Sequence, residues 1–110
     1  LFLACRELKD VDLWGKSDPR VVVYLDNADG KGYKKIGKTE VIKDNLNPNY
    51  TKSIFVDYFF EVKQQLRFKV QDDDGDDKEY LGEVETTVGQ VAGAKNQTST
   101  LDLHTKDNKF

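Results

Sequence analysis

Alternation of polar and apolar residues is the feature that most constrains the fold of this chain. In QLRFKVQ (65–71), Leu66, Phe68 and Val70 alternate with polar residues, which indicates a strand with one buried face. RVVVYLD (20–26) is β-branched and apolar, as in a buried strand. Other candidate strands occupy 1–8, 34–42, 53–60, 82–88 and 100–103. About seven short strands separated by turn sequences predict an all-β antiparallel sandwich.

Length and charge narrow the function classes. The chain has 110 residues, which fits a single domain, 1–110, with one core. Its net charge of −3 disfavours a nucleic-acid-binding protein, because such proteins are usually basic. The chain has no apolar run near the roughly 20 residues that span a bilayer. Cys5 and His104 are each the only residue of their type, which disfavours a zinc site or a catalytic triad and fits a reducing, cytoplasmic location.

Acidic residues gather in the segment VQDDDGDDKEYLGE (70–83), directly after an apolar strand. Asp12 and Asp18 precede the strand 20–26, and the loops of a sandwich can bring them beside Asp72 and Asp74. Oxygen ligands from separate loops suit Ca²⁺, which takes about 6–8 oxygens with flexible geometry. An EF-hand is excluded because placing Gly75 at its invariant glycine puts a leucine where the loop needs a bidentate glutamate. The alternative is that these aspartates are solvated turn residues.

Several motifs together resemble a C2 domain. They are the spacing of Asp12, Asp18 and Pro19, the LNPNY loop (46–50), and the D-x-D…LGE segment (72–83). KSDP, GKTEVIKDNLNPNY, VDYFFEVKQQLRFKVQD and YLGEVETTVGQV are similar to the first, N-terminal C2 domain of a copine, and the resemblance covers nearly the whole chain.

The resemblance implies an eight-stranded, Greek-key antiparallel sandwich with Ca²⁺ bound by loops at one end, and terminal strands that are incomplete in this chain. It assigns Ca²⁺-ligand roles to Asp12, Asp18, Asp72 and Asp74. The fifth acidic ligand falls on Glu79, where the family has aspartate, and Asp76 and Asp77 are alternatives. Backbone carbonyls near Leu13 and Asp73 are further candidate ligands.

Two groups of residues are candidates for membrane contact. Leu13 and Trp14 lie between the two aspartates of the first loop, and large apolar side chains on a loop suggest a contact. The alternative is that Trp14 folds back onto the sandwich. Basic residues concentrate in one hairpin region, where they either form a solvated edge or bind anionic headgroups, including phosphoinositides. They are Lys31, Lys34, Lys35, Lys38 and Lys43.

These observations predict a Ca²⁺-dependent phospholipid-binding module that brings its parent protein from the cytoplasm to anionic membranes rich in phosphatidylserine, with the plasma membrane as the expected target. The alternative is a protein-interaction domain in which Ca²⁺ stabilises the loops or is absent. An enzyme is disfavoured, because loops at the tip of a sandwich imply no substrate cleft.

Overall fold

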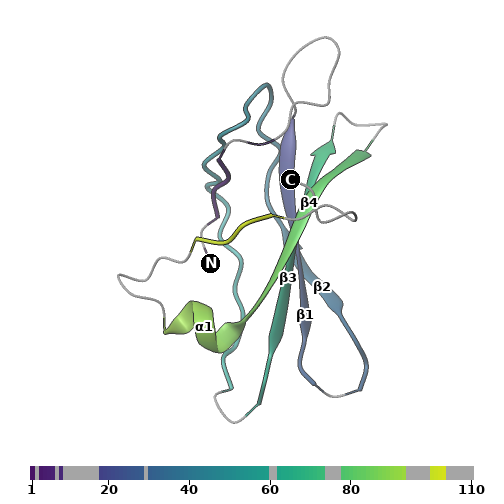
Figure 1. The fold of residues 1–110 in the computed structure, drawn as a ribbon, viewed down its shortest axis with the longest axis vertical. Coiled ribbons are helices and arrows are strands. Elements are labelled where there is room, and N and C mark those ends of the chain that lie inside the picture. Colours follow the sequence, from purple (N-terminus) through teal and green to yellow (C-terminus); the bar gives the residue numbers. More distant parts are fainter. Residues whose placement is uncertain are drawn as a thin grey trace.

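One antiparallel sheet forms the main layer of the computed structural model (Figure 1). The structure describes residues 1, 3–6, 8, 18–28, 30–59, 62–73, 78–93 and 100–103, with only the backbone at 78 and 79. The strands lie in the order β2-β1-β3-β4. Their bounds are Pro19–Asp26 for β1, Lys34–Lys38 for β2, Gln65–Asp73 for β3 and Lys78–Thr87 for β4.

The alternating sequence of β3 places its apolar residues on one face. Leu66, Phe68 and Val70 are buried, whereas the residues between them are half-buried. Val21 and Val23 of β1 belong to the same core. Burial of these side chains provides the main driving force for the sheet, at roughly 25 cal/mol per Å² of apolar surface removed from water.

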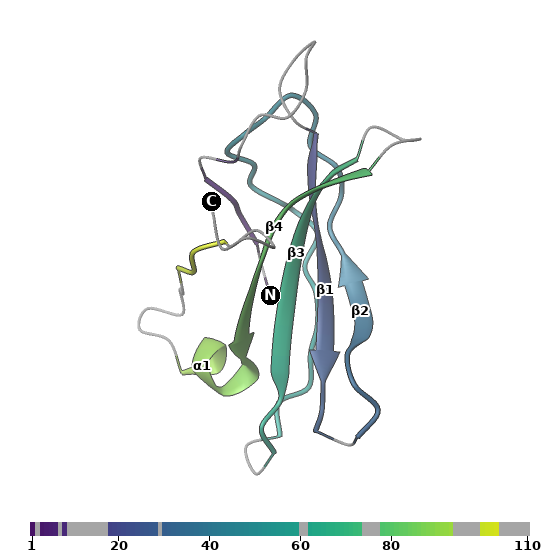
Figure 2. The same cartoon turned by 45° about the vertical axis from the view of Figure 1, so that its right-hand side comes forward.

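A second layer of extended chain faces this sheet (Figures 1 and 2). Residues 1, 3–6 and 8 run antiparallel to residues 46–54, joined by a bridge between Ala4 and Asn49. The N–H of Cys5 donates to the carbonyl of Pro48 at 2.9 Å, and the N–H of Tyr50 donates to the carbonyl of Leu3 at 3.0 Å. The antiparallel β-fold predicted from sequence is therefore confirmed.

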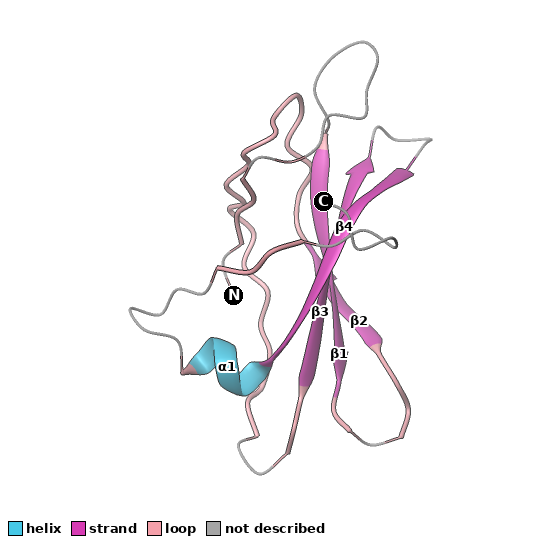
Figure 3. Ribbon diagram, in the orientation of Figure 1, coloured by secondary structure: helices cyan, strands magenta, loops and turns pink. Residues whose placement is uncertain are grey.

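The second layer is less regular than the sequence predicted, and near residues 57–59 a side chain binds backbone groups that a sheet would pair. Residues 53–59 and 100–103, expected as strands, are loops (Figure 3). The buried amide of Gln64 accepts from the N–H of Phe59 at 2.8 Å and donates to the carbonyl of Asp57 at 2.8 Å. These bonds hold the segment in place without a strand ladder.

β2 also ends earlier than expected, at Lys38 instead of residue 42. The Thr39 hydroxyl accepts from the N–H of Val21 at 2.9 Å, and so replaces the carbonyl that a continuing strand would supply. After β4, the helix α1 covers Val88–Ala92, with Thr87 as its N-cap.

Candidate functional site

Asp18 and Asp72 lie together at the end of the sheet where β1 begins and β3 ends. The antiparallel register places Pro19 opposite Asp72. The N–H of Asp18 donates to Oδ1 of Asp72 at 2.8 Å, and the N–H of Asp73 donates to the carbonyl of Asp18 at 3.0 Å. The Asp72 side chain is only 3% exposed. Two aspartates that are 54 residues apart in sequence thus share one site.

Other predicted ligands are only partly described. Glu79 is the backbone partner of Asp72 in the register of β3 and β4, so the structure places its main chain at the same end. Asp12, Leu13, Trp14, Asp74, Asp76 and Asp77 lie outside the described residues, and their roles stay predictions. Among the described residues there is no group of three or more acidic, histidine or cysteine residues that could hold a metal ion.

Asp73 differs from Asp72 in the partner of its carboxylate. Its Oδ2 lies 2.8 Å from the Arg20 guanidinium, and Arg20 also donates to the carbonyl of Thr39 at 3.2 Å. Successive residues of a strand point to opposite faces, so Asp73 turns away from Asp72. The ion pair directs the Asp73 carboxylate to Arg20, and the Asp73 carbonyl stays a predicted ligand.

A third segment reaches this end of the sheet and was missed by the sequence analysis. The N–H of Asp44 donates to Oδ1 of Asp18 at 2.8 Å. Asp44 has a left-handed backbone, with φ of +52°, which aspartate tolerates better than most residues. The available signal was the turn sequence KDNLNP, but a turn alone does not show which distant residue it contacts.

The carboxylate oxygens at this end of the sheet are of the type that binds a hard divalent cation. Oδ1 of Asp72 and Oδ1 of Asp18 each accept one backbone N–H. Within the described part of the chain, nothing donates a hydrogen bond to the Oδ2 atoms of these two carboxylates. Carboxylate oxygens from separate segments are the ligands that Ca²⁺ prefers.

The lysines predicted to bind anionic headgroups line one edge of the sheet. Lys34, Lys35 and Lys38 are exposed on β2, which is an edge strand, and Lys31 is exposed in the preceding loop. Lys43 is exposed in the segment that leads to Asp44. The structure thus presents these lysines to solvent, beside β1, whose first residue pairs with Asp72.

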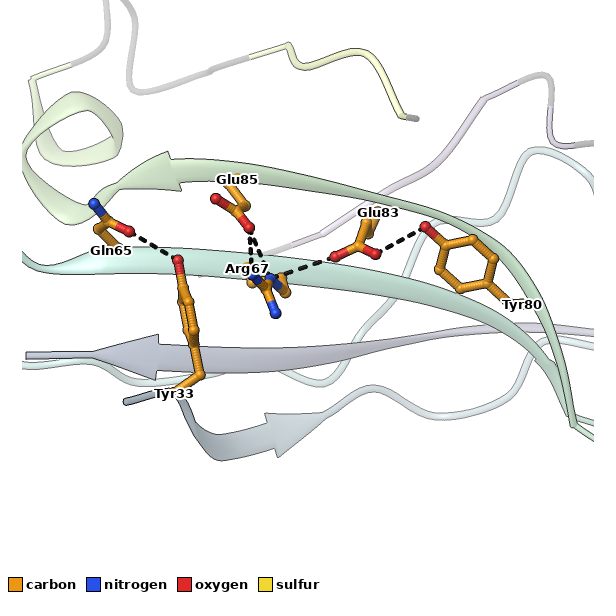
Figure 4. Close-up of polar contacts among 6 residues, drawn as sticks. All are labelled: Tyr33, Gln65, Arg67, Tyr80, Glu83 and Glu85. Atoms are coloured by element: carbon orange, nitrogen blue, oxygen red, sulfur yellow. Dashed lines mark hydrogen bonds and ion pairs between the residues drawn. The ribbon is translucent and has the colours of Figure 1, made fainter. Parts of the chain in front are cut away.

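Charges in the middle of the outer sheet face neutralise one another (Figure 4). Arg67 binds Glu85 at 2.5 Å and Glu83 at 3.3 Å, and its guanidinium lies 4.2 Å from the centre of the Tyr33 ring. The hydrogen bond to Glu85 raises the pKa of Arg67. Burial, followed by a hydrogen bond to Glu83, raises the pKa of Tyr80 to about 12. Arg67 is therefore less available to an anionic ligand than the lysines of β2.

Comparisons with known proteins agree with this architecture. A family model described as "C2 domain" matches residues 2–103. Copine-A of Dictyostelium discoideum is 38% identical over 109 residues, which cover 99% of this chain and 18% of Copine-A. The chain therefore spans about a fifth of that relative's length.

Solved structures are similar over most of the chain. A C2 domain of plant extended synaptotagmin 1 has a TM-score of 0.62 and 27% identity, over 81% of this chain and 66% of that chain. Human GIVD cytosolic phospholipase A2 has a TM-score of 0.65 and 26% identity, over 82% of this chain but only 13% of the phospholipase. In the described segments, no helix is long and apolar enough to cross a bilayer.

Proposed function

Because the chain belongs to the C2 domain family, we propose that its acidic end binds Ca²⁺ and then an anionic phospholipid surface. The observation that carries this proposal is the contact between Asp18 and Asp72, which brings carboxylates from two separate segments to one end of the sheet. Members of the C2 family commonly bind Ca²⁺ and membrane phospholipids. C2 domains are generally binding modules without catalytic activity, and we propose a binding role for this chain as well.

The residues of the chain would create a charge switch. Asp18 and Asp72, with Asp12, Asp74 and Glu79 as further proposed ligands, give this end a negative potential that repels an anionic leaflet. Bound Ca²⁺ would supply positive charge and coordination positions for lipid phosphate or carboxylate oxygens. The carboxylates would hold the cation, and the rigid end of the sheet would orient it toward the membrane without a change of fold.

Two further contacts are part of the proposal. The exposed lysines of β2 would attract anionic headgroups, including phosphoinositides, and each basic residue near such a surface contributes ~1 kcal/mol. Leu13 and Trp14 would enter the interface from the first loop. We propose that the parent protein moves in this way from the cytoplasm to the plasma membrane.

Co-sedimentation with phosphatidylserine-rich liposomes, with Ca²⁺ or with chelator, tests the proposal. The wild-type chain should pellet only with Ca²⁺, and Asp72→Asn/Asp18→Asn should abolish that difference. Replacing Lys34, Lys35 and Lys38 by glutamine should weaken pelleting with phosphoinositide liposomes, and Leu13→Ala/Trp14→Ala should weaken pelleting in general. Asp57→Asn/Asp102→Asn is the matched control, because it removes two negative charges from exposed loop residues.

Exposed apolar residues favour a second candidate function, that of a protein-interaction domain. Phe55 is 87% exposed, and Tyr58 and Phe59 are about half exposed, at 50% and 49%. Large apolar side chains that gather on a surface often mark a protein interface. Equal pelleting with and without Ca²⁺ would contradict the membrane switch and direct attention to this segment. Loss of partner capture in Phe55→Ser would then support an interaction domain.

A further inference from the structure

We propose that Asp44 is a positioning residue for the Ca²⁺ site, through its backbone N–H. This inference rests on the proposed function and adds a third segment to a site that the sequence assigned to two loops. The Asp44 N–H lies 2.8 Å from Oδ1 of Asp18, although 26 residues separate the two in sequence. A donor at Oδ1 fixes the direction of the carboxylate and leaves Oδ2 of Asp18 for a cation.

The segment that carries Asp44 is attached to β1 at several points before it reaches the site. The N–H of Thr39 donates to the carbonyl of Val21 at 2.9 Å, and the N–H of Ile42 donates to the carbonyl of Pro19 at 3.3 Å. Thr39 is buried, at 1% exposure. The Asp44 N–H therefore belongs to a fixed frame that extends from the exposed lysines of β2 to the carboxylates.

The backbone conformation of Asp44 determines how the chain turns after this donor. A φ of +52° is in the left-handed region, which glycine, asparagine and aspartate adopt readily and β-branched residues do not. The N–H is held by the preceding peptide group, and the left-handed φ lets the chain turn away after Asp44 without displacing that group. A residue that resists this conformation would have to shift the turn, and with it the N–H, away from Asp18. Groups that orient a metal ligand typically change metal affinity by about 10–100-fold when they are removed.

Three substitutions at position 44 separate the effect of the backbone conformation on Ca²⁺ affinity from the effect of the Asp44 charge. Asp44→Asn removes the charge and keeps the left-handed preference. Asp44→Gly also removes the charge and adopts the left-handed region without a steric cost. Asp44→Val removes the charge and disfavours the left-handed region. If the N–H positions Asp18, the valine variant should bind Ca²⁺ about tenfold more weakly than the asparagine and glycine variants, which should agree within about twofold.

Calorimetric titration of the full chain with CaCl₂ measures these affinities, with thermal unfolding in chelator as the control for folding. Equal affinity in all three variants, whether lowered or not, would overturn the inference. If Asp44→Val does not fold, Asp44→Ala replaces it, and a loss of about threefold relative to glycine is the expected result, since alanine also disfavours this backbone.

Hydrogen exchange measured without Ca²⁺ tests the role of Asp44 separately from Ca²⁺ binding itself. In chelator, the Asp44 amide should be protected from hydrogen exchange, and Asp18→Ala should remove that protection. An Asp44 amide that exchanges at the rate of an exposed loop would overturn the inference even if Ca²⁺ binds. Failure of the wild-type chain to bind CaCl₂, with the amide protected, would instead contradict the proposed function alone.

Discussion

Glu40 shows how much one side chain contributes at the scale of single residues. Its carboxylate accepts from the Thr51 N–H at 2.8 Å, the Thr51 hydroxyl at 2.6 Å and the Lys52 N–H at 3.2 Å. These bonds, led by the Thr51 hydroxyl, lower the pKa of Glu40 to about 2. We expect Glu40→Gln to lower the free energy of unfolding at pH 7 by about 1 kcal/mol, measured by urea denaturation.

The pH dependence of this effect has a definite sign. Because the folded-state pKa of Glu40 lies below its ordinary value of 4.5, the stabilisation is present above about pH 4.5 and is lost as the pH falls toward 2. The stability difference between Glu40→Gln and the wild type should shrink over that window. Asp102→Asn, at an exposed position, is the matched control. A difference that stays constant from about pH 7 to about pH 2.5 would exclude the carboxylate as its source.

At the scale of elements, Tyr33 ties the loop between β1 and β2 to β3. Its hydroxyl donates to the Gln65 side chain at 2.9 Å, and the Arg67 guanidinium lies over its ring. The Tyr33 side chain therefore reaches across β1 to β3 (Figure 4). A double-mutant cycle with Tyr33→Leu and Arg67→Gln should give a coupling energy of about 0.5–1 kcal/mol, measured by chemical denaturation.

Lys69 provides the control for this cycle. It lies on the same strand as Arg67 but over the ring of Tyr80, at 5.9 Å. Tyr33→Leu combined with Lys69→Gln should therefore show a coupling energy close to zero. Equal coupling in both cycles would mean that Tyr33 acts through the sheet as a whole and not through its contact with Arg67.

The strands differ in how well the sequence predicts them. β1 was predictable because it concentrates apolar residues, and β3 because its apolar and polar residues alternate. Phe68 and Val70 of β3 are buried, as that alternation requires. The segment 53–59 has an equally apolar sequence but is not a strand, and the N–H of Phe59 and the carbonyl of Asp57 bond the Gln64 side chain instead of a neighbouring strand. Such a replacement depends on a side-chain contact that no period in the sequence reveals.

At the scale of the whole molecule, the candidate site also combines features that the sequence pattern predicts with a contact that it does not reveal. Asp18 and Asp72 could be predicted as neighbours, since the ends of paired antiparallel strands meet and both residues match the motifs of the family. Asp44 could not, because its role depends on a left-handed backbone and on a hydrogen bond between residues 26 positions apart. Residues that orient ligands are harder to predict from sequence than the ligands themselves.

The whole domain should couple its two proposed ligands reciprocally. If Ca²⁺ is shared between the carboxylates of Asp18 and Asp72 and the oxygens of a lipid headgroup, vesicles must tighten Ca²⁺ binding by the same factor by which Ca²⁺ tightens vesicle binding. We expect a factor of about 5–150, the usual range for coupling between sites. Ca²⁺ titrations with phosphatidylserine vesicles, and with neutral phosphatidylcholine vesicles as the control, measure it. Equal Ca²⁺ affinity with both kinds of vesicle would show that the cation only stabilises the loops, because a ligand without differential binding cannot shift the equilibrium.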